Sequence, residues 1–135
     1  MSGDPLDLTG LWDGTFRYPG DGPDTPFLCR ITDNGGRLTG IITEPDMFYR
    51  SAGTLSAELA GVRRDRSVDF VKTYRGQRVG YEKPVDYVGQ VSSDGLVITG
   101  SWSLSRWDGS FEMFRDPPYA EEEQVEEATK VPLDR

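Results

Sequence analysis

The 135-residue chain contains no histidine and only one cysteine, Cys29. Without imidazole there is no Ser-His-Asp or Cys-His nucleophile system, no histidine-ligated haem or zinc, and no side chain that ordinarily titrates near neutral pH. A single cysteine forms no intrachain disulfide, so the fold does not depend on oxidation and suits a reducing compartment. We therefore expect neither a bound metal nor another cofactor.

Long apolar runs are also missing. No stretch approaches the roughly 18 residues that a membrane-spanning helix needs, and the first residues lack the basic and apolar regions of a signal peptide. The 15 basic and 23 acidic side chains give a net charge of −8, which argues against binding to the phosphates of nucleic acid. The sequence predicts a cytoplasmic protein that binds neither membranes nor nucleic acids.

Half of the negative charge lies in residues 121–135, where five Glu and one Asp stand against one Lys and one Arg, a net of −4. This segment has too few apolar side chains to offset the entropy of ordering it, so we expect a disordered acidic tail. The predicted organisation is an N-terminal extension at 1–7, a β-barrel domain at 8–116 and the acidic tail at 117–135.

The central residues alternate between apolar and polar in short runs that glycine or proline separates, which is typical of β-strands. Hairpin signals stand at 33–36 (Asp-Asn-Gly-Gly) and 92–95 (Ser-Ser-Asp-Gly). The expected strands are 11–18, 27–32, 37–44, 53–60, 67–74, 85–91, 96–104 and 110–115. Together they predict an all-β fold, an antiparallel up-and-down meander barrel of about eight strands.

Two repeated sequence motifs support one strongly coiled sheet. A Leu/Ile-Thr-Gly motif ends at positions 10, 40 and 100, and Trp12 and Trp102 each follow two residues after the glycine. A glycine within a strand indicates a sharp bend or the close approach of another backbone, as a small barrel requires. Trp-Asp-Gly recurs at 12–14 and 107–109, and the second copy is consistent with either a strand or a hairpin turn.

Alternation places the aromatic-rich face of each strand inside the barrel. The opposite face carries apolar side chains that favour a homodimer, namely Ile41, Val71, Val88, Val97 and Phe114. The basic cluster at 63–66 is interpreted as a solvated hairpin loop.

Several charged or hydroxyl groups share the inward parity, namely Tyr18, Glu44, Lys72, Tyr74, Tyr87 and Arg115. An ionised group inside an apolar barrel is costly unless it is paired, so such groups are structural pairs or a site. In one interpretation Lys72 and Arg115 lie near the open ends, extend to water and pair with Glu44. In the other, the same groups form the polar floor of a cavity and orient an otherwise apolar ligand.

Gly-x-Trp at 10–12, Trp-x-Gly-x-Phe at 12–16 and Ile-Thr-Gly-Ser-Trp at 98–102 resemble motifs of calycin barrels, the avidin and lipocalin types. The pattern is also similar to a group of small uncharacterised bacterial barrel domains, and it covers about residues 8–115. The resemblance implies a barrel with an apolar pocket to which Trp12 and Trp102 contribute. The polar groups that hold biotin have no counterparts here, and the proximal histidine of the haem-binding barrels is absent.

The leading functional hypothesis is a barrel that binds a small apolar or weakly anionic ligand. Its predicted ligand-binding residues are Trp12, Phe16, Tyr18, Phe70, Lys72, Tyr87, Trp102, Met113 and Arg115. The alternative is a cyclase, isomerase or lyase, for example in natural-product biosynthesis, with Lys72, Glu44, Tyr74 and Tyr87 as catalytic groups. A third hypothesis is a filled barrel that binds another protein, and the volume of the interior distinguishes it from the first two.

Overall fold

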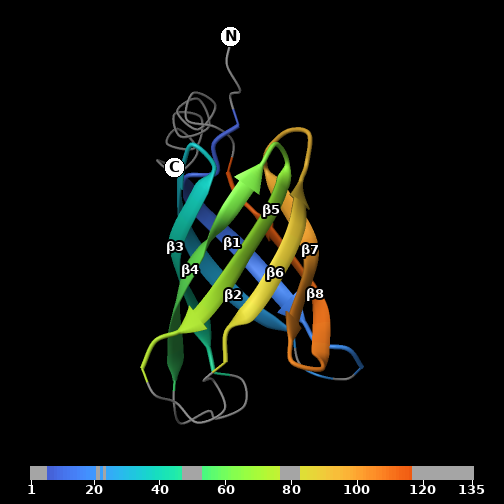
Figure 1. The fold of residues 1–135 in the computed structure, drawn as a ribbon. Coiled ribbons are helices and arrows are strands. Elements are labelled where there is room, and N and C mark those ends of the chain that lie inside the picture. The colour runs from blue at the N-terminus through green and yellow to red at the C-terminus, as the bar shows by residue number, and fades with distance from the viewer. Residues whose placement is uncertain (1–5, 21, 23, 47–52, 77–82, 117–135) are drawn as a thin grey trace, which may run out of the picture.

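The computed structural model describes residues 6–20, 22, 24–46, 53–76 and 83–116, and every regular element among them is a strand (Figure 1). The strands are β1 (Gly10–Arg17), β2 (Thr25–Asn34), β3 (Arg37–Pro45), β4 (Thr54–Arg64), β5 (Ser67–Tyr74), β6 (Val85–Val91), β7 (Val97–Leu104) and β8 (Trp107–Phe114). Each strand pairs antiparallel with the next, and β8 pairs with β1. The predicted all-β meander barrel is confirmed.

Two predicted segments lie at the ends of the chain. The acidic tail at 117–135 lies outside the described residues, as do residues 1–5 of the expected N-terminal extension. Among the described residues, no helix is long and apolar enough to cross a bilayer.

Both predicted glycine-containing hairpins form where the sequence places them. Gly35 and Gly36 connect β2 to β3 with φ angles of 63° and 100°, and Gly95 has a φ of 77° in the turn before β7. The second Trp-Asp-Gly motif, by contrast, belongs to a strand. The turn lies earlier, at 105–106, where Ser105 has a φ of 56°.

The strand glycines allow neighbouring backbones to approach closely, as the repeated glycine motifs predict. A Cβ atom at Gly100 would overlap the carbonyl oxygen of Val88, and one at Gly40 would overlap that of Arg30. Because backbone atoms cannot move aside as a flexible side chain can, these positions exclude any larger residue while the barrel keeps this curvature.

The inward faces form one core of aliphatic and aromatic side chains. Burial alternates strictly along β2, where residues 25, 27, 29, 31 and 33 are buried and the residues between them are exposed. Aromatic rings meet in two groups. Phe16, Tyr18 and Trp102 make edge contacts at centroid distances of 5.3–6.3 Å, whereas Phe70 stacks on Tyr87 at 5.0 Å.

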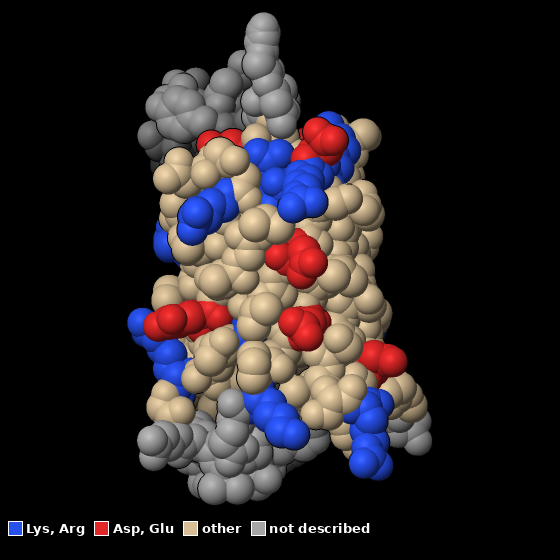
Figure 2. All heavy atoms as spheres, in the orientation of Figure 1, with Lys and Arg blue, Asp and Glu red and all other residues tan. Residues whose placement is uncertain are grey.

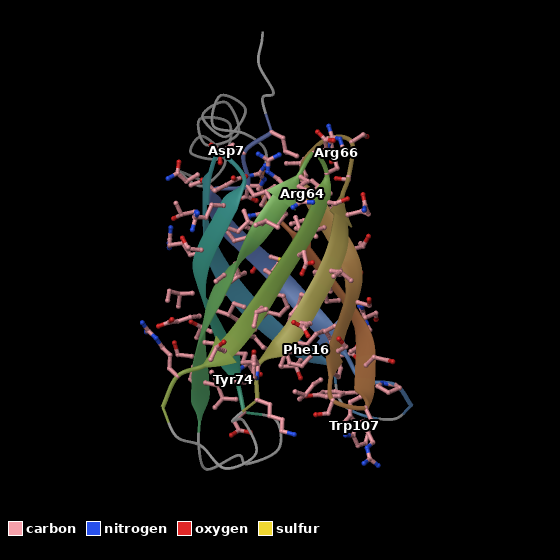
Figure 3. The ribbon with its side chains drawn as sticks, viewed as in Figure 1. Asp7, Phe16, Arg64, Arg66, Tyr74 and Trp107 are labelled. Carbon is pink, nitrogen blue, oxygen red and sulfur yellow. The ribbon has the colours of Figure 1, made fainter. Side chains whose placement is uncertain are left out.

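The two ends of the barrel differ. At what we call the closed end, the connections are short, at 35–36, 65–66 and 92–96, and Leu8 is fully buried there. At the loop end, the connections at 18–24, 46–53 and 75–84 are longer, and only the turn at 105–106 is short. Figure 3 shows Asp7, Arg64 and Arg66 at the closed end, and Phe16, Tyr74 and Trp107 toward the loop end.

Candidate functional site

A buried polar cluster lies toward the loop end of the barrel. The ammonium nitrogen of Lys72 donates to Glu44 Oε1 at 3.0 Å, and the hydroxyl of Tyr74 donates to Glu44 Oε2 at 2.7 Å. The side chains of Lys72 and Glu44 are 2% and 3% exposed, so water screens this ion pair very little. We refer to Glu44, Lys72 and Tyr74 as the polar cluster.

A small residue on the intervening strand lets this cluster form. Glu44 is on β3, and both Lys72 and Tyr74 are on β5, so the contact must cross the inner face of β4. On β4 the residue in register with Tyr74 is Ala57, which is 1% exposed. Because the Ala57 side chain is a single methyl group, Glu44 can reach Lys72 and Tyr74 across the inner face of β4.

Lys72 is also surrounded by aromatic rings. Its ammonium nitrogen lies 4.4 Å from the ring centroid of Phe16, 4.7 Å from that of Tyr74 and 5.4 Å from that of Tyr87. Such contacts with ring faces stabilise a desolvated cation. Burial nevertheless lowers the pKa of Lys72, and the Glu44 carboxylate opposes that shift.

The phenols near the cluster are held in their neutral form. Burial raises the pKa of Tyr74 and that of Tyr87, and the negative charge of Glu44 adds to both shifts. Burial likewise raises the pKa of Tyr18 to about 12, with smaller contributions from Glu44 and Asp46. At neutral pH these hydroxyls therefore serve as hydrogen-bond donors and not as bases.

Two further polar residues are buried at this end. Asp46 follows β3 and is 5% exposed, and Thr25 begins β2 and is 2% exposed. The hydroxyl of Thr25 makes no hydrogen bond within the described part of the protein. A buried hydroxyl without a protein partner is uncommon, and it is available to hydrogen-bond with water or with another molecule.

The interior beneath the cluster is filled by side chains. A small space is bounded by Phe27, Cys29, Ile42, Phe70, Lys72, Tyr87 and Met113, and it is too small to hold a water molecule. Burial raises the pKa of the Cys29 thiol to about 12, so this cysteine is an inert core residue at neutral pH. A ligand therefore has no room in this space, and by the volume criterion this part of the interior matches the filled-barrel hypothesis and not an internal ligand pocket.

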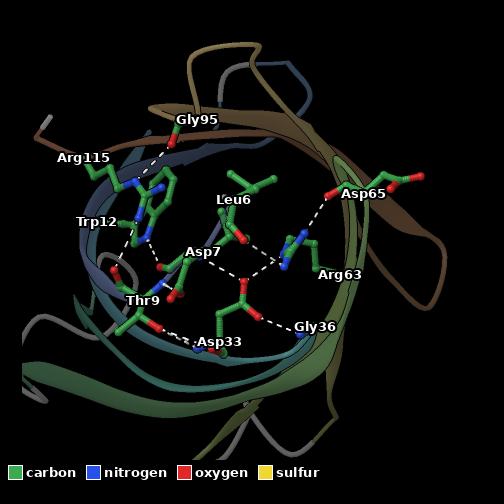
Figure 4. A network of polar contacts seen from close by, with 11 residues as sticks. Leu6, Asp7, Thr9, Trp12, Asp33, Gly36, Arg63, Asp65, Gly95 and Arg115 are labelled. Atoms are coloured by element: carbon green, nitrogen blue, oxygen red, sulfur yellow. Dashed lines mark hydrogen bonds and ion pairs between the residues drawn. The ribbon is translucent and has the colours of Figure 1, made fainter. Parts of the chain in front are cut away.

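Two of the predicted ligand-binding residues lie at the closed end, apart from the polar cluster (Figure 4). The guanidinium of Arg115 lies 4.7 Å from the ring centroid of Trp12 and donates to the carbonyl of Gly95 at 3.0 Å. The indole nitrogen of Trp12 donates to the carbonyl of Leu8 at 2.9 Å. These contacts attach the segment before β1 to the barrel.

Asp33 is the centre of the closed end and was not among the predicted site residues. Its carboxylate accepts from the Leu8 amide at 3.0 Å, the Gly36 amide at 2.8 Å and Arg63 Nε at 2.8 Å. Burial alone would raise the pKa of Asp33, but these hydrogen bonds and the Arg63 charge hold it below its ordinary value. The solvated hairpin loop predicted at 63–66 is thus wrong for Arg63, whose side chain is only 9% exposed because Asp33 binds it.

The structure therefore divides the predicted site. The loop-end half brings together Phe16, Tyr18, Glu44, Lys72, Tyr74, Tyr87 and Trp102, with Phe70 and Met113 in the packed interior below. Lys72 pairs with Glu44 as one interpretation expected, although Lys72 is buried and does not extend to water. Thr25 and Asp46 join this half without having been predicted.

Within the described residues, no group of three or more Cys, Asp or Glu side chains could hold a metal ion. Comparison of the chain with protein-family models, with curated proteins and with solved structures found no match. The eight-stranded closed barrel is shown by the structure itself, and the calycin relationship stays a prediction.

Proposed function

We propose that this barrel binds a small, largely apolar molecule at its loop end, with the polar cluster orienting the polar group of the ligand. The observation that carries the proposal is the buried Glu44–Lys72 pair with its Tyr74 hydrogen bond. The proposed ligand rests on the cluster from the side of the loops, because the space below the cluster is filled.

The energetic cost of the pair supports a functional role. Removing two charges from water costs several kcal/mol for each ion, and well-packed apolar residues of similar volume are often as stable or more stable. The remaining core shows that apolar packing is available in this barrel, since the neighbouring inward positions hold Phe16, Phe70 and Tyr87. Groups with perturbed pKa values that converge at one end of a fold are typical of binding and catalytic sites.

The hydroxyl groups around the cluster suit a neutral polar group on the ligand. Tyr18 and Tyr74 are half-buried at this end, and the Thr25 hydroxyl has no hydrogen-bond partner among the described residues. A ligand hydroxyl or carbonyl could exchange hydrogen bonds with these groups without adding a charge. The Lys72 charge that favoured a weakly anionic ligand is already paired with Glu44, and Asp46 adds a second buried carboxylate.

The test compares three probes that share one apolar body: 2-naphthol, 2-naphthoate and 2-naphthylmethylamine. Binding is measured by quenching of tryptophan fluorescence, because Trp102 lies next to Tyr18 at 5.3 Å. We expect saturable binding, with the anionic naphthoate the weakest of the three. Native mass spectrometry of freshly purified protein provides a second readout, a small molecule that stays with the folded chain and leaves on denaturation.

Two threonine variants form a matched pair for this test. Thr25→Val changes the loop end and Thr9→Val makes the same change at the closed end, where the Thr9 hydroxyl accepts from the Asp33 amide at 2.9 Å. We expect Thr25→Val and Tyr74→Phe to weaken binding several-fold and Thr9→Val to leave it unchanged. Equal effects of the two threonine variants, or no saturable binding of any probe, would exclude the proposed site.

The enzyme hypothesis has one specific observation in its favour, the lowered pKa of Lys72 beside Glu44 and Tyr74. An amine with a lowered pKa can add to a carbonyl or transfer a proton. Incubation with 2-naphthaldehyde and a hydride reductant tests it, since reduction of the imine leaves a stable mass increase. Labelling that is lost in Lys72→Met would support a reactive amine, and labelling confined to exposed lysines would contradict it.

A further inference from the structure

We propose that the barrel forms a two-fold symmetric dimer through an apolar band on the outer face of β7, β8, β1, β2 and β3. The band consists of five exposed side chains, Leu11, Leu28, Ile41, Val97 and Phe114, which are 36–50% exposed. They come from five successive strands around the closed barrel. The proposal concerns the outer surface and does not depend on the proposed ligand site.

The strand register makes these five residues neighbours. Val97 is directly opposite Phe114. Leu28 is opposite Asp13, two residues from Leu11, so the two leucines are diagonal neighbours, within about 7–8 Å. By the same rule Leu28 is diagonal to Ile41, and Phe114 is diagonal to Leu11. The side chains therefore form a continuous band across the sheet.

Charges of both signs flank the band, and Glu58 is directly opposite Ile41. Asp13 is directly opposite both Leu28 and Phe114, and Arg30 is directly opposite both Leu11 and Ile41. Asp13 and Arg30 thus lie on opposite sides of the Leu11–Leu28 diagonal. Both are exposed, and neither makes an ion pair or side-chain hydrogen bond among the described residues.

This arrangement is complementary to itself. In a face-to-face dimer the two-fold axis lies in the plane of the interface, and here it would run along the Leu11–Leu28 diagonal. Rotation about that axis places the Asp13 side of one copy against the Arg30 side of the other. The dimer would therefore bury Leu11 and Leu28 at its centre and form two equivalent Asp13–Arg30 pairs between the copies.

Val62, Val88 and Trp107 are also exposed, but they lie outside this band. Val88 on β6 is 48% exposed, but its direct neighbours across the sheet are Asp69 and Ser101. The face of the barrel that carries β4, β5 and β6 bears scattered charges of both signs (Figure 2). Of the stripe predicted from sequence, Ile41, Val97 and Phe114 belong to the band, whereas Val71 is half-buried and Val88 lies on another face.

The first experiment measures the mass of the full chain in solution by analytical ultracentrifugation across a dilution series. We expect a reversible monomer–dimer equilibrium that Leu28→Lys shifts to monomer. Val88→Lys is the matched control, because Val88 has almost the same exposure as Leu28 (48% against 46%), and it should leave the equilibrium unchanged. Thermal unfolding of each variant confirms that the barrel is intact.

Charge reversal then tests the predicted symmetry. Asp13→Arg and Arg30→Asp each place like charges together at the interface and should raise the dimer dissociation constant at least tenfold. The double variant D13R/R30D restores both pairs and should dimerise like the original chain. The two single variants, when mixed, should form a heterodimer in which both charge pairs are again opposite.

A protein that stays monomeric at the highest accessible concentration would overturn the proposal. So would a dimer that Leu28→Lys leaves intact, because the contact would then lie on another face. A dimer that Leu28→Lys disrupts but whose charge-reversed single variants do not recover on mixing would contradict the proposed two-fold axis.

Discussion

Breaking the Glu44–Lys72 pair from either side should give two variants whose stabilities depend on pH in opposite directions. In Glu44→Gln, the Lys72 amine stays 2% exposed and loses its counter-ion. In the folded variant the Lys72 amine is then neutral. Deprotonating a lysine of ordinary pKa at pH 7 costs about 4–5 kcal/mol. In the unfolded chain Lys72 is protonated, so folding releases a proton and this cost falls by about 1.4 kcal/mol for each unit of rising pH.

Lys72→Met leaves the Glu44 carboxylate buried without a cation. The carboxyl group then takes up a proton on folding, which costs about 3–4 kcal/mol at pH 7. Because the unfolded chain is ionised at this pH, the cost falls as the pH is lowered toward the ordinary pKa of glutamate. The double variant Glu44→Gln/Lys72→Met has no charge to bury and should be nearly independent of pH.

The assay is urea unfolding of the three variants between about pH 6 and pH 9, followed by tryptophan fluorescence. Trp12 and Trp102 are both buried and report on the two ends of the barrel. We compare the free energy of unfolding of each variant with that of the original chain. The loss should become smaller with rising pH for Glu44→Gln and larger with rising pH for Lys72→Met. Parallel pH profiles, or losses below about 1 kcal/mol for both single variants, would refute the reasoning, because a solvated pair behaves in that way.

Three further predictions follow from the same structure. Gly100→Ala should cost about 1–3 kcal/mol in thermal or urea unfolding, because the new methyl group would overlap the Val88 carbonyl; an unchanged midpoint would show that the strands can separate there. Tyr87 has a raised pKa, so its stabilising effect is present below about pH 10 and is lost above it; a titration followed at the phenolate absorbance should show one late-ionising group fewer in Tyr87→Phe. Asp33 has a lowered pKa, so the stability that it contributes with Arg63 is lost as the pH falls below about 4; Asp33→Asn should be less stable at neutral pH and should lose less on acidification, and equal acid sensitivity would contradict this role.

The barrel could be predicted from the sequence because it depends on local patterns. Alternation of period two gave the inward faces, and glycines at turns and within strands gave the corners, as Gly35, Gly36 and Gly100 show. The strand that begins at Trp107 was predicted to start three residues later, since Asp108–Gly109 matches a hairpin signal. What decides that segment is its pairing with β7, a contact between strands that local chemistry does not encode.

The candidate site was predicted in part. The parity of the strand positions placed Glu44, Lys72 and Tyr74 inside the barrel. Parity does not give the position of a residue along the barrel axis, so Trp12 and Arg115 were grouped with residues of the opposite end. Asp33 and Thr25 share the parity of Phe27, and that signal could have identified both. Asp46 follows the last residue of β3 but keeps the inward parity of Ile42 and Glu44, so the same signal could have identified it.

An even number of antiparallel strands has a practical consequence for work with this protein. Since β1 starts and β8 finishes beside each other at the closed end, the polypeptide enters and leaves the barrel on the side away from the polar cluster (Figure 1). An affinity tag, fluorophore or surface anchor joined directly before residue 6 or after residue 116 is therefore attached at the far side of the barrel from Glu44, Lys72 and Tyr74. Immobilised in this way, the barrel would present its loop end to the solution, which makes it a convenient scaffold for screening compounds.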